Sequence, residues 1–170
     1  MTAIRIGALG AATILPWALI RPARAVDGLE VTAVASRDHG RAEAFAARHA
    51  LPVVHDSYAD LLDDPEVDAV YIPLPNGLHA EWALRAIEAG KHVLCEKPFT
   101  ANRAEAESVA AAADAVAPRG QVVMEAFQRL RSFLGLQRHR GGRDGAFRQT
   151  GCSAKVTRRR WCNPSRSRGG

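Results

Sequence analysis

The chain has 170 residues, of which 47% are hydrophobic and 24% charged, so it is long enough for one domain with a buried core. Its net charge of +5 is the sum of an acidic and a basic part. Residues 1–127 carry 11 Lys and Arg and 17 Asp and Glu, whereas residues 128–170 carry 12 Lys and Arg and one Asp. The basic excess therefore says nothing about the partners of the first part. Three cysteines are too few for a disulfide framework and no apolar run is long enough for a membrane span, so we expect a cytoplasmic protein.

The first elements are a strand over residues 4–9, a turn of small residues, and a helix from Thr13 to about Arg24 with Pro16 in its first turn. The same segment imitates a secretory signal, since Arg5 precedes an apolar run and a small-residue site at residues 23–25. We favour the strand, because signal cleavage would remove the first strand of an otherwise complete series.

The remaining elements alternate between strands and helices. Hydrophobic patterning predicts strands at residues 30–35, 52–54, 69–72, 92–95 and 121–127, and helices at residues 38–49, 57–62, 79–89 and 102–117. Ser57 is a candidate helix cap, Gly90 suits a helix C-terminus, and Asn102 with Glu105 has the spacing of a capping box. Strands that alternate with helices, some apolar on both faces, predict an α/β fold with a Rossmann-type, doubly wound parallel sheet.

The turn after the first strand is a candidate phosphate-binding loop. It reads GALGAATIL, with Gly10 at the first position of the G-x-G-x-x-G pattern, while Ala12 and Leu15 replace the other two glycines. Backbone amides at such a strand-to-helix turn can bind a pyrophosphate. The alternative is a turn of small residues that only lets the helix pack on the strand.

The end of the second strand bears on cofactor choice. Ser36 occupies the region where an acidic residue would bind the ribose 2′-hydroxyl of NAD, and Arg37 follows it. A guanidinium suits a 2′-phosphate, so this end favours NADP over NAD, with Arg41 one turn on as an assisting residue. A solvated arginine at a helix start is the competing interpretation.

Two further polar segments follow strands. Leu74, Pro75, Asn76 and His79 come after the strand at 69–72, and Glu96-Lys97-Pro98 ends the strand at 92–95. A lysine at a strand's carboxyl end can give a proton or hydrogen bond to an alcohol or carbonyl oxygen. The plainer alternatives are a common Asn-Gly turn and a solvated lysine, and Cys95 fits a core position better than a nucleophile.

These segments together resemble the glucose–fructose oxidoreductase, inositol dehydrogenase and MocA-like family of NAD(P)-dependent oxidoreductases. The matching stretches are IGALGAATI, AVASRD, VDAVYIPLPNGLHAEWALRAIEAGKHVLCEKP and VVMEAF, over about residues 3–127. The resemblance implies a cofactor-binding Rossmann domain at residues 1–127, with NADP preferred over NAD, and hydride transfer to or from a sugar, polyol or related alcohol.

The resemblance also implies the site residues. Lys97 corresponds to the family's catalytic lysine, the bond before Pro98 is often cis in the family, and no metal is implied. The implied cofactor contacts are Gly10, Ala11, Ala12, Thr13, Ile14, Ser36, Arg37, Arg41, Leu74, Pro75, Asn76, His79, Glu96 and Lys97. The AVASRD variant resembles the NADP-using branch that includes dihydrodiol and xylose dehydrogenases.

Residues 128–170 depart from the family pattern. They are rich in Arg, Gly and Ser without a helix or strand period, so we expect an unstructured basic tail. A shift of the reading frame at about Gln128 is our hypothesis for its origin. The family's second α/β domain, which forms the substrate pocket and usually the dimer interface, is not recognisable there, so we expect this chain to bind nucleotide but to be catalytically impaired. The alternative is a non-enzymatic nucleotide-binding or interaction module whose basic tail binds nucleic acid, which we consider less favoured. A zinc site at His139, Cys152 and Cys162 is disfavoured by the spacing.

Overall fold

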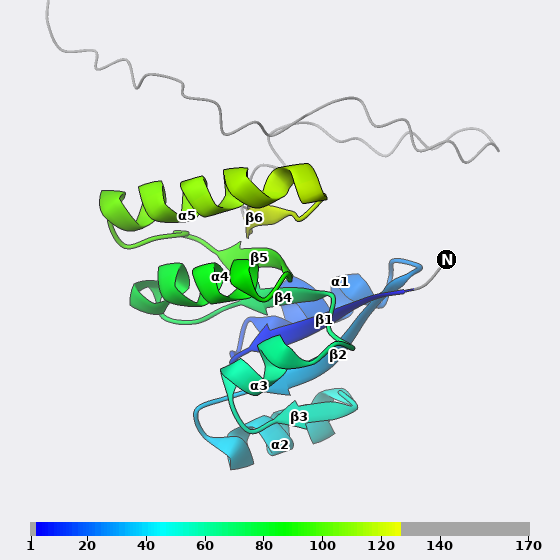
Figure 1. Ribbon diagram of the computed structural model, residues 1–170. Coiled ribbons are helices and arrows are strands. Elements are labelled where there is room, and N and C mark those ends of the chain that lie inside the picture. The colour runs from blue at the N-terminus through cyan, green and yellow to red at the C-terminus, as the bar shows by residue number, and fades with distance from the viewer. Residues whose placement is uncertain (1–2, 127–170) are drawn as a thin grey trace, which may run out of the picture. The chain divides into compact units, whose positions relative to one another are not determined.

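The computed structural model of the chain describes residues 3–126. Its six strands form one sheet in the order β3-β2-β1-β4-β5-β6, and every neighbouring pair is parallel (Figure 1). The strands are β1 (Ile4–Leu9), β2 (Leu29–Ala35), β3 (Val53–His55), β4 (Ala69–Ile72), β5 (His92–Glu96) and β6 (Val123–Ala126). This is the strand order of a Rossmann fold, and it reverses direction between β1 and β4, where such sheets bind ligands.

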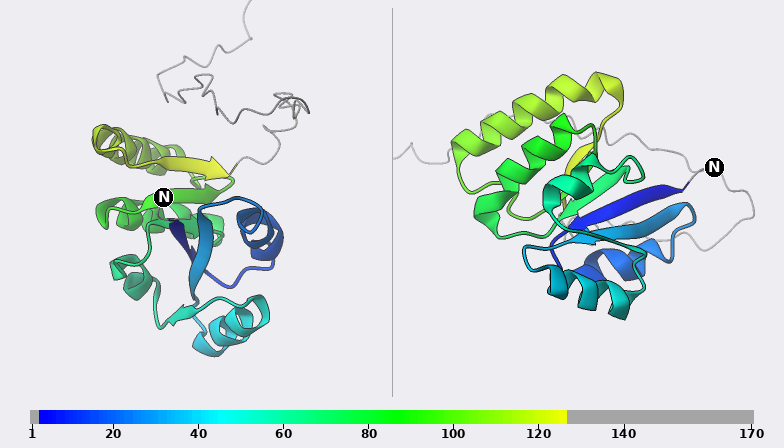
Figure 2. Two further views of the ribbon diagram at one scale, coloured as in Figure 1. Left: turned by 90° about the vertical axis from the view of Figure 1, so that its right-hand side faces the viewer. Right: turned by 60° about the horizontal axis from the view of Figure 1, so that its bottom comes forward.

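Helices cover both faces of the sheet. They are η1 (a π-helical segment, Pro16–Ile20), α1 (Arg21–Ala23), α2 (His39–His49), α3 (Tyr58–Asp63), η2 (a 3₁₀ turn, Asn76–Leu78), α4 (His79–Glu88), α5 (Arg103–Val116) and η3 (a 3₁₀ turn, Ala117–Arg119). In the left view of Figure 2, α3, α4 and α5 lie on one side of the sheet, with α1 and α2 on the other. The predicted doubly wound α/β fold is therefore confirmed.

Two separate cores follow from the alternation of side chains along the strands. In β4, Val70 and Ile72 pack into the core beneath α3, α4 and α5, whereas Tyr71 between them packs into the core beneath α1 and α2. Val70, Tyr71 and Ile72 are all buried. A strand that is buried on both faces is typical of a parallel sheet covered by two helical layers.

The predicted caps are confirmed. The Ser57 hydroxyl accepts from the Asp60 amide at 3.1 Å, and the Asn102 side chain accepts from the Glu105 amide at 3.0 Å. Gly90, just past the end of α4, has a φ of 77°, which favours glycine. Side-chain oxygens thus satisfy amides that a helix start leaves unpaired.

Two predicted boundaries are wrong. The first helix begins at Pro16 rather than Thr13, because the Leu15 amide bonds to the Ala12 carbonyl at 3.1 Å and closes a turn ahead of the helix. The last strand begins at Val123 rather than Gln121, whose side-chain amide instead donates to the carbonyls of Ile87 (3.0 Å) and Lys91 (2.7 Å). The other boundaries agree with the predictions to within one residue.

An ion-pair network joins β1 to β4 at the amino ends of the strands. The Arg5 guanidinium donates to both carboxylate oxygens of Asp68 at 2.9 and 3.0 Å, and the Arg5 amide donates to Asp68 Oδ2 at 2.8 Å. Glu66 pairs with the same guanidinium. These bonds lower the pKa of Asp68 to about 2.

A pH dependence follows for Asp68. The folded-state pKa lies below its ordinary value of 3.8, so the stabilisation is complete above about pH 4 and is lost as the pH falls towards about 2. We expect Asp68→Asn to lower stability at pH 7 and to flatten the fall in unfolding free energy between about pH 4 and pH 2.5. Urea unfolding across that range measures this. Asp27→Asn, at an exposed carboxylate, is the control, and equal slopes for wild type and Asp68→Asn would contradict the assignment.

Within residues 3–126, no helix is both long enough and apolar enough to cross a membrane. The expectations for the basic tail, for nucleic-acid or zinc binding by it, and for Phe127 in the last strand fall outside these residues.

Candidate functional site

The glycine turn after β1 is anchored to β2. The Gly10 amide donates to the Ala35 carbonyl at 2.7 Å. The φ of Gly10 is 116°, a backbone conformation that is strained for residues with a side chain. A Cβ on Gly10 would lie 3.2 Å from the Leu74 side chain. Glycine therefore lets the turn approach the segment that follows β4, while Thr13 and Ile14 lie exposed beyond it.

The segment after β2 meets the same turn. Arg41, in the first turn of α2, donates from Nη2 to the Ala11 carbonyl at 3.1 Å. Asp38 caps α2, since its carboxylate accepts from the Arg41 amide at 3.0 Å. Ser36 is buried and Arg37 is exposed. Asp38, the acid nearest the end of β2, is thus engaged as the cap of α2. Within residues 3–126, no ion pair includes the exposed guanidinium of Arg37.

The buried His79 side chain contacts the backbone of the segment after β4. Pro75 and Asn76 are exposed at the start of η2, whereas His79 at the start of α4 is only 2% exposed. Its Nε2 lies 2.6 Å from the Leu74 carbonyl oxygen, and its Nδ1 lies 2.8 Å from the Pro98 carbonyl oxygen. His79 therefore bridges the loops that follow β4 and β5, and its ring is occupied by backbone rather than open to a ligand.

The turn after β5 presents Lys97 to solvent. Lys97 is exposed, and the peptide bond between Lys97 and Pro98 is cis. Glu96 beneath it is 8% exposed and accepts from the Tyr71 hydroxyl at 2.5 Å. The Phe99 amide donates to Glu125 of β6 at 3.0 Å. Side chains from β4, α4 and β6 thus hold this turn.

Tyr71 and Glu125, which help to hold this turn, were not predicted from the sequence. A tyrosine within the apolar strand AVYI was a usable signal, because a buried phenol needs a hydrogen-bond partner and a buried carboxylate at the next strand's end supplies one. Glu125 carried no comparable signal, since its partner is a backbone amide. Cys95 is fully buried, and burial raises its pKa to about 12, which fits the predicted core position.

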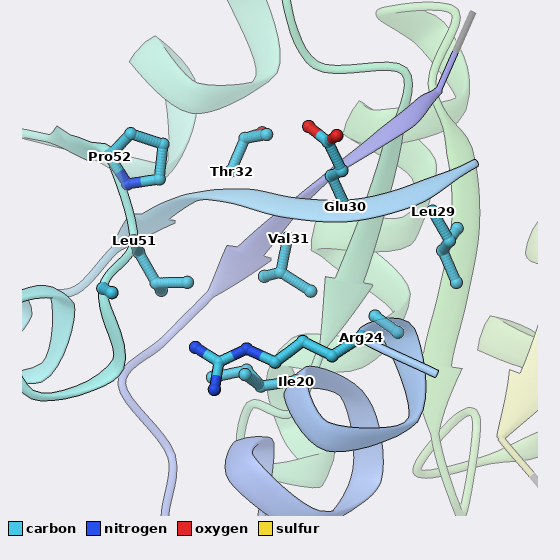
Figure 3. A pocket seen from close by; sticks show the side chains of 10 residues that line it. Ile20, Arg24, Leu29, Glu30, Val31, Thr32, Leu51 and Pro52 are labelled. Atoms are coloured by element: carbon cyan, nitrogen blue, oxygen red, sulfur yellow. The ribbon is translucent and has the colours of Figure 1, made fainter. Parts of the chain in front are cut away.

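A cavity of about 350 Å³ lies away from all of these residues, at the amino half of β2. Figure 3 shows Ile20, Arg24 and Val31 on one side of β2, with Glu30 and Thr32 pointing to the other. The Thr32 hydroxyl is buried and has no hydrogen-bond partner among the described residues, and Arg24 donates to the His49 carbonyl at 2.7 Å. None of the predicted cofactor residues lines this cavity.

Residues 4–127 match the family model of the glucose–fructose oxidoreductase, inositol dehydrogenase and MocA group, described as an oxidoreductase family with an NAD-binding Rossmann fold. The chain belongs to this oxidoreductase family. The match covers most of the chain and coincides with the region that the resemblance had indicated.

Similar members of the family are sugar oxidoreductases by name. A D-xylose 1-dehydrogenase (NADP(+)) from Haloferax volcanii is 48% identical over 71% of this chain and 36% of that protein. A dTDP-3,4-didehydro-2,6-dideoxy-alpha-D-glucose 3-reductase from Actinomadura kijaniata is 46% identical over 81% of this chain and 39% of that protein.

Solved structures also match. A 3-ketoreductase from Actinomadura kijaniata, solved in complex with NADP and TDP-benzene, has a TM-score of 0.65 and 44% identity over 73% of this chain and 37% of that one. The chain thus spans less than half the length of the family members it matches.

Proposed function

We propose that residues 1–127 form the nucleotide-binding domain of an NADP-preferring oxidoreductase that acts on a sugar, a polyol or a related alcohol or carbonyl compound. The observation that carries the proposal is that four polar or glycine-bearing segments follow β1, β2, β4 and β5 at the carboxyl edge of one parallel sheet. In open parallel sheets this edge, at the reversal of strand order, is where nucleotides bind.

The residues present fit a dinucleotide. The turn at Gly10, Ala11 and Ala12 has no bulky side chain, and a Cβ on Gly10 would already press on Leu74, so this turn suits close approach of a pyrophosphate. Ser36, Arg37 and Arg41 suit the adenosine 2′-phosphate, because Asp38 is engaged as a helix cap and the exposed guanidinium of Arg37 is free to pair with phosphate. The names of the similar xylose dehydrogenase and 3-ketoreductase, both associated with NADP, support this preference.

Lys97 is the proposed catalytic residue. When bound, the nicotinamide ring supplies or accepts the hydride. Lys97, exposed at the end of β5, would donate a hydrogen bond or proton to the substrate oxygen, with Pro75 and Asn76 on the nicotinamide side. The sugar names of the similar family members support a sugar-like substrate, and the few cysteines suit a reducing cytoplasm.

Chemical-shift mapping tests the proposed site. When NADPH is added to the ¹⁵N-labelled chain, we expect the amide resonances of Gly10, Arg37, Asn76 and Lys97 to move. The amides of Leu29 to Thr32, which line the cavity in Figure 3, should not move. Shifts confined to the cavity residues, or none at saturating NADPH, would contradict the proposal.

A further inference from the structure

Tyr71 and Glu96 form a buried pair beneath the turn that carries Lys97. Tyr71 lies in β4 and is 1% exposed, and its hydroxyl donates to Glu96 Oε1 at 2.5 Å. Burial and the neighbouring Glu96 raise the pKa of Tyr71, which keeps the phenol protonated and able to donate. One oxygen of the Glu96 carboxylate is thereby fixed towards the interior.

The second carboxylate oxygen is also engaged. Glu96 Oε2 accepts from the backbone amide of Lys97 at 3.2 Å. Within residues 3–126, none of the ion pairs closer than 4.0 Å includes the Lys97 ammonium, although Glu96 is its neighbour in sequence. The carboxylate nearest to Lys97 along the chain is therefore held by a phenol and a backbone amide instead of by the ammonium.

We propose that Tyr71 is a positioning residue for Lys97: by holding the Glu96 carboxylate in the interior, it prevents an ion pair between Glu96 and Lys97 and leaves the lysine nitrogen free to meet a substrate oxygen. This inference rests on the role of Lys97 in the proposed function. A carboxylate that pairs with a lysine raises the pKa of the lysine, so that the neutral amine forms only at higher pH. The ion pair must also break before the lysine nitrogen can contact the substrate oxygen.

The other titratable groups around the turn come from three elements. They are Cys95 in β5, whose pKa is raised by burial, His79 in α4, and Glu125 in β6. Glu125 accepts from the Phe99 amide and His79 faces the Pro98 carbonyl, so both have partners other than the Lys97 ammonium. Tyr71→Phe removes the hydroxyl that holds Glu96. The charge near Lys97 that this substitution frees to move is therefore the Glu96 carboxylate.

The test is a pH titration of Lys97 in the full chain without nucleotide. The sequence has three lysines, Lys91, Lys97 and Lys155, so ¹³Cε-lysine labelling gives three signals, and Lys97→Arg identifies the one of interest. In Tyr71→Phe we expect the Lys97 midpoint to rise by about 0.5 pH unit or more, with about a threefold fall in its acylation rate by an amine reagent at pH 8. Tyr58→Phe, at the other tyrosine of the chain, should leave both readings unchanged.

Two comparisons decide whether Glu96 carries the effect. In a Glu96→Gln background, Tyr71→Phe should no longer move the Lys97 midpoint, and Glu96→Gln alone should move it by less than Tyr71→Phe does. A folded Tyr71→Phe chain with an unchanged midpoint overturns the proposal. So does an equal shift in the Glu96→Gln background, or a fall of about one pH unit in Glu96→Gln alone, since the carboxylate would then already face the ammonium. These readings are made without nucleotide, so they are separate from the NADPH mapping that tests the proposed function.

Discussion

Replacing His79 by alanine is expected to lower the free energy of unfolding by about 2–4 kcal/mol. The imidazole is 2% exposed, and its removal leaves a cavity at the start of α4. It also removes the ring that bridges the carbonyl oxygens of Leu74 and Pro98, which lie 2.6 and 2.8 Å from the ring nitrogens. These contacts are partly shielded from solvent, so their loss adds to the cost of the cavity.

Urea unfolding at pH 7 measures the effect of His79→Ala. His39→Ala is the matched control, because His39 lies at the start of α2 with a side chain that is 45% exposed, and its loss should change stability by less than about 0.5 kcal/mol. A loss below about 1 kcal/mol in His79→Ala would show that the two loops hold their positions without the imidazole. Because these loops carry Asn76 and Lys97, we also expect the variant to bind NADPH less tightly.

Replacing Arg37 by alanine is expected to weaken NADPH binding by about ten- to a hundredfold, which corresponds to the loss of a charge-assisted hydrogen bond to phosphate. NADH lacks the 2′-phosphate, so its dissociation constant should change by less than about threefold, a difference too small for a lost charged contact. Asp38, the nearest acid, is held by the Arg41 amide, so we do not expect it to take over contacts to the ribose.

Fluorescence titration with the two nucleotides separates the outcomes for Arg37→Ala. The matched control is Arg119→Ala, an exposed arginine in η3 that should leave both affinities unchanged. Equal weakening of NADPH and NADH binding would mean that Arg37 supports the loop rather than reading the phosphate.

The sequence predicts the order of strands and helices well, because the strands are short apolar runs and the helices begin at recognisable caps such as Ser57 and Asn102. The Rossmann-type parallel sheet and the family also follow from the sequence, through the resemblance in residues 3–127. The start of the first helix is less predictable. Thr13 and Ile14 have helix-compatible neighbours, and only the hydrogen bond between Leu15 and Ala12 shows that a turn intervenes.

The site residues divide by the kind of information that identifies them. Gly10, Arg37 and Lys97 can be chosen from their positions after strands, since the carboxyl ends of parallel strands share one edge. The contacts of His79 with the Pro98 carbonyl and of Glu96 with Tyr71 join residues that are 19 and 25 positions apart, and no local pattern specifies them. The sequence therefore predicts which segments form the edge, whereas the structure shows which side chains hold those segments in place.

The most direct test of the account is isothermal titration calorimetry of the unmodified 170-residue chain with NADPH and with NADH. We predict saturable binding of one nucleotide per chain, with NADPH bound at least about tenfold more tightly than NADH, because only NADPH offers a 2′-phosphate to Arg37. Absence of saturable heat with either nucleotide, in a chain that circular dichroism shows to be folded, would contradict the proposal that this edge of the sheet binds a dinucleotide.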